Sequence, residues 1–258
     1  MIDTHAHLAY QDYEADSKAV LERAWQVGLE AIVLIGAGAS WAGNQQTLEF
    51  AQQDPRLWVS LGFHPCDAEK VELADFALLE KHLRDPKVVA IGELGLDFHW
   101  PIDRKKQYDV LLPQLELAKK YQLPIIIHSR KAEAELWAEL KKVGHPPQKG
   151  VFHCFAGDVN FAQEVIAEGY VLGIGGVLTF KNAKSLHEVV KAVPLEALIL
   201  ETDAPYLAPE PFRGKRNEPA YVDFVAQKIA ELKNISVEEV RRVTTETARR
   251  LFHLKEVL

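Results

Sequence analysis

Short apolar runs recur along the whole chain, and each is followed by a segment with helical periodicity. In the first such segment Val20, Leu21 and Ala24 fall on one helical face, which is the pattern of a helix packed on a core. The apolar runs are rich in β-branched residues and apolar on both faces, as is typical of parallel strands covered by helices. They occupy residues 2–8, 31–36, 57–63, 88–94, 124–129, 150–155, 170–176 and 197–203.

The apolar runs repeat about every 28 residues, which is the spacing of successive strand–helix units. Eight such units in 258 residues predict a (β/α)8 barrel of the TIM type, with a doubly wound open sheet as the alternative. Two further helices, at about 218–233 and 236–252, are predicted after the last strand. No linker, charge block or shift in composition divides the chain, so we expect a single domain over residues 1–258.

The composition is that of an ordinary globular protein, with 48% hydrophobic and 26% charged residues, and it excludes disordered and collagen-like chains. The first residues lack the basic and apolar regions of a signal peptide, and no run approaches the roughly 18 apolar residues of a membrane span. Cys66 and Cys154 need not pair in a chain of this length, and so few cysteines favour a reducing compartment. We therefore expect a cytoplasmic monomer without membrane contact.

The net charge of −7 limits how the protein can meet a nucleic acid. An acidic surface does not attract polyanions over long range, so local cations or bound metal would have to capture such a substrate. The glycines at 173, 175 and 176 lack the spacing and the acidic partner of a dinucleotide-binding fingerprint. No dinucleotide cofactor is therefore expected.

Most of the predicted strands end in side chains that can bind a metal ion. In a barrel these carboxyl ends meet at one face, where several buried imidazoles are costly unless a cation coordinates them. His5 and His7 lie two residues apart on one strand, so both side chains point to the same face and can reach one ion. The other side chains of this kind belong to His64, Glu93, His128, His153, Glu201 and Asp203.

Six of these side chains are the predicted metal ligands: His5, His7, Glu93, His128, His153 and Asp203. Six ligands are too many for one tetrahedral site and suit two divalent ions bridged by a carboxylate. Glu93 is the predicted bridge, and a salt bridge from Glu93 to Arg130 or Lys181 is the alternative. Imidazole and carboxylate ligands leave Zn, Mn, Mg, Ni and Co undistinguished. One ion is expected at His5, His7, Glu93 and Asp203, and the other at Glu93, His128 and His153.

At these residues the sequence resembles the TatD family of metal-dependent deoxyribonucleases, within the amidohydrolase-like hydrolases. The resemblance implies a TIM-type barrel, one or two divalent metals, and hydrolysis of ester bonds, most often in DNA. Its metal ligands fall at the six positions given above. Ala9 departs from the family, which usually has an acidic or amide residue there; because this position is not a metal ligand, altered loop packing rather than lost activity is expected. The matching motifs are DTHAHL (3–8), SLGFHP (60–65), AIGELGLDF (90–98), LPIIIHSRKA (123–132), GVFHCFAG (150–157), GIGG (173–176), ILETDAPYLAP (199–209) and FRGKRNEP (212–219).

Cations near the predicted strand ends are candidates for phosphate binding. The segment 204–218 is long for a connection after a strand and contains the most basic short stretch of the chain, Arg213, Lys215 and Arg216. A solvated run of charge is the alternative interpretation. The other predicted substrate contacts are His64 and Arg130, which lies two residues after a predicted metal ligand. His64 could instead protonate the leaving group or serve a structural role.

These residues predict a hydrolase in which metals generate a hydroxide at neutral pH. Asp203 is expected to accept a proton from the metal-bound water, and Glu93 and His64 complete the predicted catalytic set. The leading hypothesis is a DNA phosphodiesterase, with an exonuclease acting from an end as one form. A carboxylic ester or amide hydrolase, such as a deacylase of mischarged tRNA, and a non-catalytic metal-binding barrel are the alternatives.

Overall fold

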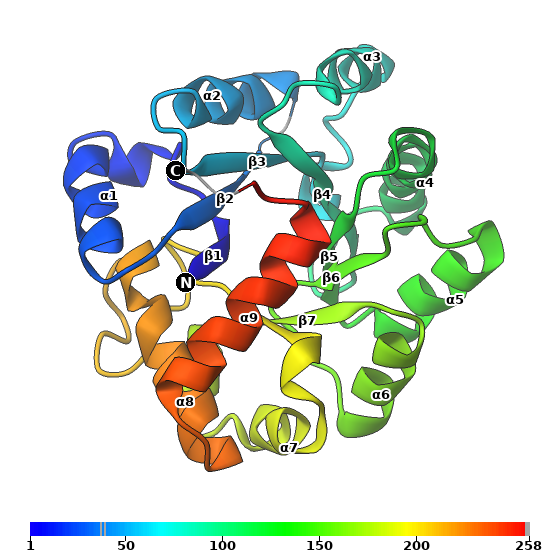
Figure 1. The fold of residues 1–258 in the computed structure, drawn as a ribbon. Coiled ribbons are helices and arrows are strands. Elements are labelled where there is room, and N and C mark those ends of the chain that lie inside the picture. Colours follow the sequence, from blue (N-terminus) through cyan, green and yellow to red (C-terminus); the bar gives the residue numbers. More distant parts are fainter. Residues whose placement is uncertain (37, 39, 256–258) are drawn as a thin grey trace. The chain divides into compact units, whose positions relative to one another are not determined.

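The computed structural model describes residues 1–36, 38 and 40–255 (Figure 1). Eight strands lie in one sheet in the order of the sequence, and the five strand pairs β1–β2, β3–β4, β4–β5, β5–β6 and β7–β8 are parallel. This order, with helices between successive strands, confirms the predicted TIM-type (β/α)8 barrel. The strands are β1 (Ile2–Ala6), β2 (Ala31–Ile35), β3 (Leu57–Leu61), β4 (Val88–Asp97), β5 (Ile125–Arg130), β6 (Gly150–Phe152), β7 (Val171–Ile174) and β8 (Leu198–Leu200).

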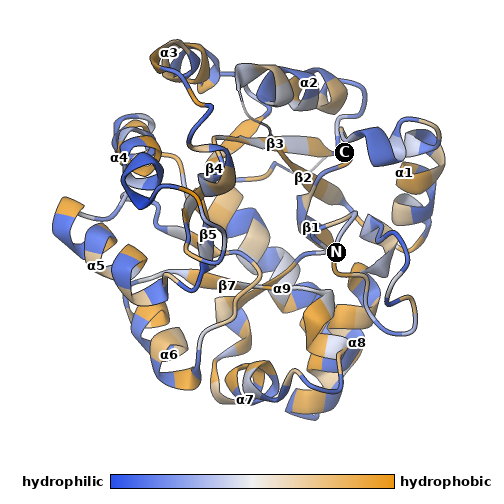
Figure 2. Ribbon diagram, turned by 180° about the vertical axis from the view of Figure 1, so that it is seen from behind, coloured by the Kyte–Doolittle hydropathy of each residue, from blue (hydrophilic) through white to orange (hydrophobic). Residues whose placement is uncertain are grey.

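The α-helices alternate with the strands along the chain. Figure 2 shows hydrophobic and hydrophilic residues alternating along helices such as α5 and α8, so each of these helices has an apolar face to bury. Among the described residues, no helix combines the length and the apolar content that crossing a bilayer requires. The helices are α1 (Ser17–Gln26), α2 (Trp41–Ala51), α3 (Leu73–His82), α4 (Arg104–Tyr121), α5 (Glu133–Val143), α6 (Val159–Ala167), α7 (Lys184–Ala192), α8 (Val222–Lys233) and α9 (Val237–Phe252).

The chain divides into two compact units. The terminal unit comprises Met1–Leu34 and Cys154–Leu258, and the central unit comprises Ile35–His153. A single domain over residues 1–258 therefore stays a prediction.

In the terminal unit the last strand returns to the first. A parallel bridge joins Ala6 to Ala204, and the N–H of His7 donates to the carbonyl of Ala204 at 2.7 Å. Helix α9 packs against both β1 and β8. The side chains that follow β1 and those that follow β8 are thereby brought together, as barrel closure requires.

The predicted strands end at different residues from the observed ones, and two of them show a physical reason for the difference. The run 88–94 continues to Asp97, whose N–H and carbonyl are both bonded by the side chain of Gln107. The run 197–203 leaves the strand early, because the N–H of Thr202 donates to the carboxylate of Asp3 instead of to a strand neighbour. In both cases a buried side chain decides where the ladder ends.

The connection between β8 and α8 is held against the first part of the terminal unit. The hydroxyl of Tyr13, which is fully buried, donates to the carbonyl of Asn217 at 2.5 Å. The guanidinium of Arg23 donates to both carboxylate oxygens of Glu218, with the shortest bond at 2.6 Å. Glu218 is buried, so this bidentate pair supplies the charge compensation that its carboxylate needs.

Replacing Arg23 with Gln should lower the free energy of unfolding by about 1–3 kcal/mol, because the carboxylate of Glu218 would be left buried without its cation. Urea denaturation followed by circular dichroism measures this change. Lys18→Gln, which removes a charge from an exposed position of the same helix, serves as the control. Equal stability of the two variants would contradict the assigned role of the ion pair.

Candidate metal centre

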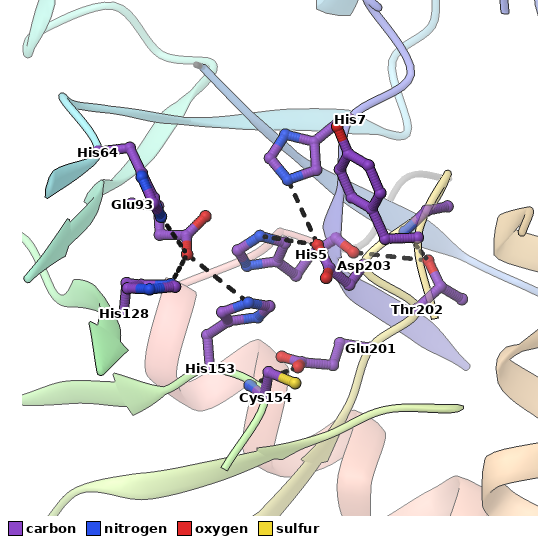
Figure 3. A network of polar contacts seen from close by, with 12 residues as sticks. His5, His7, His64, Glu93, His128, His153, Cys154, Glu201, Thr202 and Asp203 are labelled. Atoms are coloured by element: carbon purple, nitrogen blue, oxygen red, sulfur yellow. Dashed lines mark hydrogen bonds and ion pairs between the residues drawn. The ribbon is translucent and has the colours of Figure 1, made fainter. Parts of the chain in front are cut away.

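Three predicted ligands meet in the terminal unit. Nε2 of His5 lies 3.7 Å and Nε2 of His7 lies 3.4 Å from Oδ1 of Asp203. His5 is fully buried, His7 nearly so, and the side chain of Asp203 is 14% exposed. Figure 3 shows the three side chains pointing toward one another. They form the terminal cluster.

The spacing within the terminal cluster fits a shared cation better than direct hydrogen bonds. N–H···O bonds measure about 2.7–3.2 Å. Ligand atoms at 2.0–2.1 Å from a tetrahedral ion lie about 3.3 Å apart, close to the 3.4 and 3.7 Å observed. The donor set and its geometry therefore fit a divalent metal ion.

Asp3 fixes the backbone beneath the terminal cluster, a role that the sequence reasoning missed. Its Oδ1 accepts from the N–H groups of His5 and Thr202, and its Oδ2 accepts from the Thr202 hydroxyl at 2.6 Å. Complete burial raises the pKa of Asp3 to about 8, although the bonds from Thr202 and His5 act in the opposite direction. The N–H of Asp203 in turn donates to the carbonyl of His5 at 2.8 Å. The available signal was that Asp3 and His5 share one face of the strand.

The second group of predicted ligands lies in the central unit. Oε1 of Glu93 is 2.8 Å from Nδ1 of His128, 3.6 Å from Nε2 of His153 and 3.5 Å from Nε2 of His64. Glu93 and His153 are buried, and the three imidazoles are directed toward the Glu93 carboxylate (Figure 3). We call these four residues the central cluster. Because the predicted bridging by Glu93 involves ligands of both units, it stays a prediction.

A bulge in β4 places Glu93. The register with β5 advances by three residues in β4 and by two in β5 between the pairs Ile91–Ile125 and Leu94–Ile127. The preceding Gly92 has φ 148°, and a Cβ there would lie 2.5 Å from the carbonyl oxygen of Ile126. Only glycine allows the chain to pass this point, and the bulge reorients the Glu93 side chain.

Asp97 orients His128, a role that no pattern in the sequence predicted. Nε2 of His128 donates to Oδ2 of Asp97 at 3.0 Å, which leaves Nδ1 facing Glu93. A carboxylate that fixes the imidazole tautomer in this way is a common support of metal-ligating histidines. Asp97 lies three residues beyond the predicted strand 88–94, so no strand pattern in the sequence pointed to it.

The two carboxylates also shift the protonation of His128. Burial lowers the pKa of His128, but the hydrogen bonds with Asp97 and Glu93 outweigh it and raise the pKa to about 8. Burial acts to raise the pKa of Asp97, yet the bonds from His128 and from the N–H of His99 bring it down to about 2. In the metal-free protein the imidazolium of His128 is therefore held between two carboxylates.

His64 is positioned as a hydrogen-bond donor. Its Nδ1 accepts from the N–H of Cys66 at 3.1 Å, so the proton of the neutral ring resides on Nε2. Nε2 faces Glu93 and is part of the central cluster. An N–H at this position suits contact with a substrate oxygen better than ligation of a metal.

The predicted phosphate-binding cations differ in their surroundings. Arg216 donates to both carboxylate oxygens of Asp16, at 2.8 and 2.6 Å, so its charge is already compensated. The guanidinium of Arg213 lies 4.2 Å from the ring centroid of Phe180, and Nζ of Lys215 lies 5.9 Å from that of Phe212. Within the described part of the chain neither of these two cations has a carboxylate partner.

Arg130, in the central unit, is exposed at the end of β5. Its guanidinium lies 5.9 Å from the ring centroid of Trp100, which is 51% exposed. Among the described residues no ion pair joins Arg130 to Glu93, the alternative weighed for that carboxylate. Arg130 therefore lies beside an exposed aromatic ring and has no ion-pair partner among the described residues, although its charge helps to lower the pKa of Asp97.

Comparison with known proteins decides the family. The family model described as TatD related DNase matches residues 2–253. The chain belongs to the TatD family of metal-dependent hydrolases. The TatD resemblance inferred from the motifs is thus confirmed.

Individual TatD relatives match over nearly their whole length. A protein of Bacillus subtilis (strain 168), named uncharacterized metal-dependent hydrolase YabD, is 43% identical over 255 residues, covering 98% of this chain and 99% of that protein. The uncharacterized metal-dependent hydrolase TatD of Mycobacterium tuberculosis is 34% identical, with 98% of both chains covered. The crystal structure of YJJV, a TatD homolog from Escherichia coli K12, superposes with a TM-score of 0.91 at 33% identity and covers 99% of this chain and 98% of that one.

In the metal-free TatD-family protein, Asp97→Asn should lower the pKa of His128 from about 8 toward its ordinary value, because a carboxylate acceptor is lost. A histidine whose folded pKa is raised adds stability that is present below its unfolded pKa of about 6.5 and lost as the pH rises through about 8. The variant should therefore be destabilised more at pH 6 than at pH 9.

NMR titration of the histidine rings and denaturation at both pH values provide the measurements. Asp109→Asn, an exposed carboxylate paired with Lys105, is the control. An unchanged His128 pKa in the Asp97 variant would show that Asp97 does not set the protonation of this ring.

Proposed function

We propose that the protein is a divalent-metal-dependent phosphodiesterase that hydrolyses DNA. The observation that carries this proposal is the presence of two clusters of imidazole and carboxylate groups whose ligand atoms lie close enough together to hold a metal ion. The description of the matching family as DNase-related supports DNA as the substrate.

Each cluster is proposed to hold one cation. In the terminal cluster the ligands are His5, His7 and Asp203, and in the central cluster they are Glu93, His128 and His153. Bound divalent ions supply positive charge for phosphoryl oxygens and lower the pKa of a coordinated water. Zn, Mn, Mg, Ni and Co would all suit these ligands, and Glu93 is the carboxylate that two ions would share.

The chain's own residues then have distinct tasks. The carboxylate of Asp203 retains some exposure and is proposed to accept the proton of the attacking water. Glu93 holds the imidazoles of the central cluster in place. His64 presents the N–H on Nε2 to a phosphate or leaving-group oxygen, because its Nδ1 is engaged by Cys66.

The cations without carboxylate partners favour a phosphodiester over an uncharged ester. Arg130 in the central unit and Arg213 and Lys215 in the terminal unit can each donate to phosphate oxygens without first breaking an ion pair. Arg216 is less suited to this task because Asp16 already binds its guanidinium. Because the chain has a net charge of −7, binding of a phosphate backbone would depend on such local cations.

A cytoplasmic, monomeric protein remains part of the proposal. In the described part of the chain neither Cys66 nor Cys154 forms a disulfide, as suits a reducing compartment.

Cleavage of a single-stranded oligonucleotide should require added Mn²⁺ or Zn²⁺, stop on chelation and fall at least about a hundredfold in His128→Ala, because a metal ligand is lost. His145→Ala, outside both clusters, is the matched control. Activity of His128→Ala equal to that of His145→Ala would refute the metal mechanism.

The same preparation should be tested on bis-p-nitrophenyl phosphate and on a carboxylic ester, with elemental analysis of its metal content. Cleavage of the ester alone would favour the ester or amide hydrolase, and metal content without any cleavage would favour the non-catalytic barrel.

Replacing both Arg213 and Lys215 with Gln should weaken binding of single-stranded DNA and reduce the slope of log K against log salt by about 1.4, since two phosphate contacts are lost. Arg216→Gln should change the slope less, because its charge is compensated by Asp16. Fluorescence anisotropy at several salt concentrations measures both. A slope that stays the same in the double variant would exclude these cations from the DNA path.

A further inference from the structure

Tyr206 occupies a fixed position beside the terminal cluster. It lies three residues after Asp203, and its N–H donates to the carbonyl of Asp203 at 2.8 Å. Its own carbonyl accepts from the side-chain amide of Asn217, a fully buried residue, at 2.7 Å. The backbone of Tyr206 is therefore held from both sides, and its position beside the cluster does not depend on a ligand.

The ring of Tyr206 is large, aromatic and 53% exposed. Its centroid lies 6.1 Å from that of His7, with an angle of 69° between the ring planes. A second tyrosine already supports His7, because Tyr10 stacks on it with the centroids 4.8 Å apart and the planes at 19°. The ring of Tyr206 thus meets the imidazole of His7 edge-on. Much of the ring surface is exposed to solvent next to the proposed reaction centre.

The same connection carries a cation that is held by an aromatic ring. Arg213 lies over Phe180, and the neighbouring N–H of Glu210 donates to the hydroxyl of Thr179 at 2.8 Å, which ties this part of the connection to the segment before α7. An exposed aromatic ring and an uncompensated guanidinium on one ordered segment are the combination with which proteins bind single-stranded nucleic acids. The aromatic ring stacks on a base, and the cation binds the phosphate backbone of the nucleic acid.

We propose that Tyr206 stacks on a base of single-stranded DNA and thereby selects strands with exposed bases over phosphodiesters without bases. This inference rests on the proposed function and adds the feature of the substrate that is recognised. In a duplex the faces of the bases are covered by their neighbours, so a frayed end or a single strand offers the surface that the ring needs.

The test compares a thymidine oligonucleotide with an abasic oligonucleotide of the same length. Binding is measured by fluorescence anisotropy in the presence of a chelator, and KM and kcat are measured with Mn²⁺. Tyr206→Ala should weaken binding of the thymidine strand roughly five- to a hundredfold and leave that of the abasic strand unchanged. The same variant should raise KM for the thymidine strand and leave kcat within about twofold.

Two further variants separate stacking from other roles. Tyr206→Phe keeps the ring and should bind both strands as the unchanged protein does. Leu207→Ala removes a neighbouring exposed side chain, 39% exposed, and should have no effect on the preference for bases. Thermal unfolding of all variants confirms that they are folded.

Equal losses for the two strands, no loss, or a loss in Tyr206→Phe as large as in Tyr206→Ala would each overturn the inference. So would a protein that binds neither strand. A protein that prefers the thymidine strand through Tyr206 but cleaves no DNA would refute the proposed function and leave the stacking role standing.

Discussion

Buried imidazoles and carboxylates need a partner for each lone pair and each N–H, and this requirement shapes the structure around both clusters. Asp3 and Asp97 receive hydrogen bonds from the segments that carry the ligands, while the ligand atoms themselves stay 3.4–3.7 Å apart in the terminal cluster. A cation is the partner that these remaining atoms can share. In the central cluster, the bulge at Gly92 orients the Glu93 carboxylate toward its imidazole partners.

The fold could be predicted because its signal is repeated eight times. Each apolar run is short and is followed by a helical segment, so an error at one run does not alter the count. The boundaries could not be predicted equally well. Strand β4 continues to Asp97 because the side chain of Gln107 is hydrogen-bonded to the backbone of Asp97. Strand β8 stops before Thr202 because the N–H of Thr202 donates to Asp3. No local sequence pattern connects Gln107 or Asp3 with those strands.

The candidate ligands could be named from residue type and position, and the structure groups His5 and His7 with Asp203, and Glu93 with three of the other histidines. The supporting residues could not be found in this way. The role of Asp97 depends on which nitrogen of His128 it meets. Likewise, the basic stretch at 213–216 looks uniform in sequence, whereas Arg216 is paired with a carboxylate 200 residues away. Contacts of that range are set by the fold and leave no local trace.

The buried bond from Tyr13 to Asn217 and the ion pair of Arg23 with Glu218 have a consequence for ligand recognition. The segment that carries Tyr206 and Arg213 is ordered during folding, together with the first helix of the chain. Its loss of conformational freedom is therefore part of the folding equilibrium and does not recur when a substrate arrives. Under the proposed function this segment would meet its substrate as a rigid surface, and the DNA strand would contribute most of the ordering that association requires.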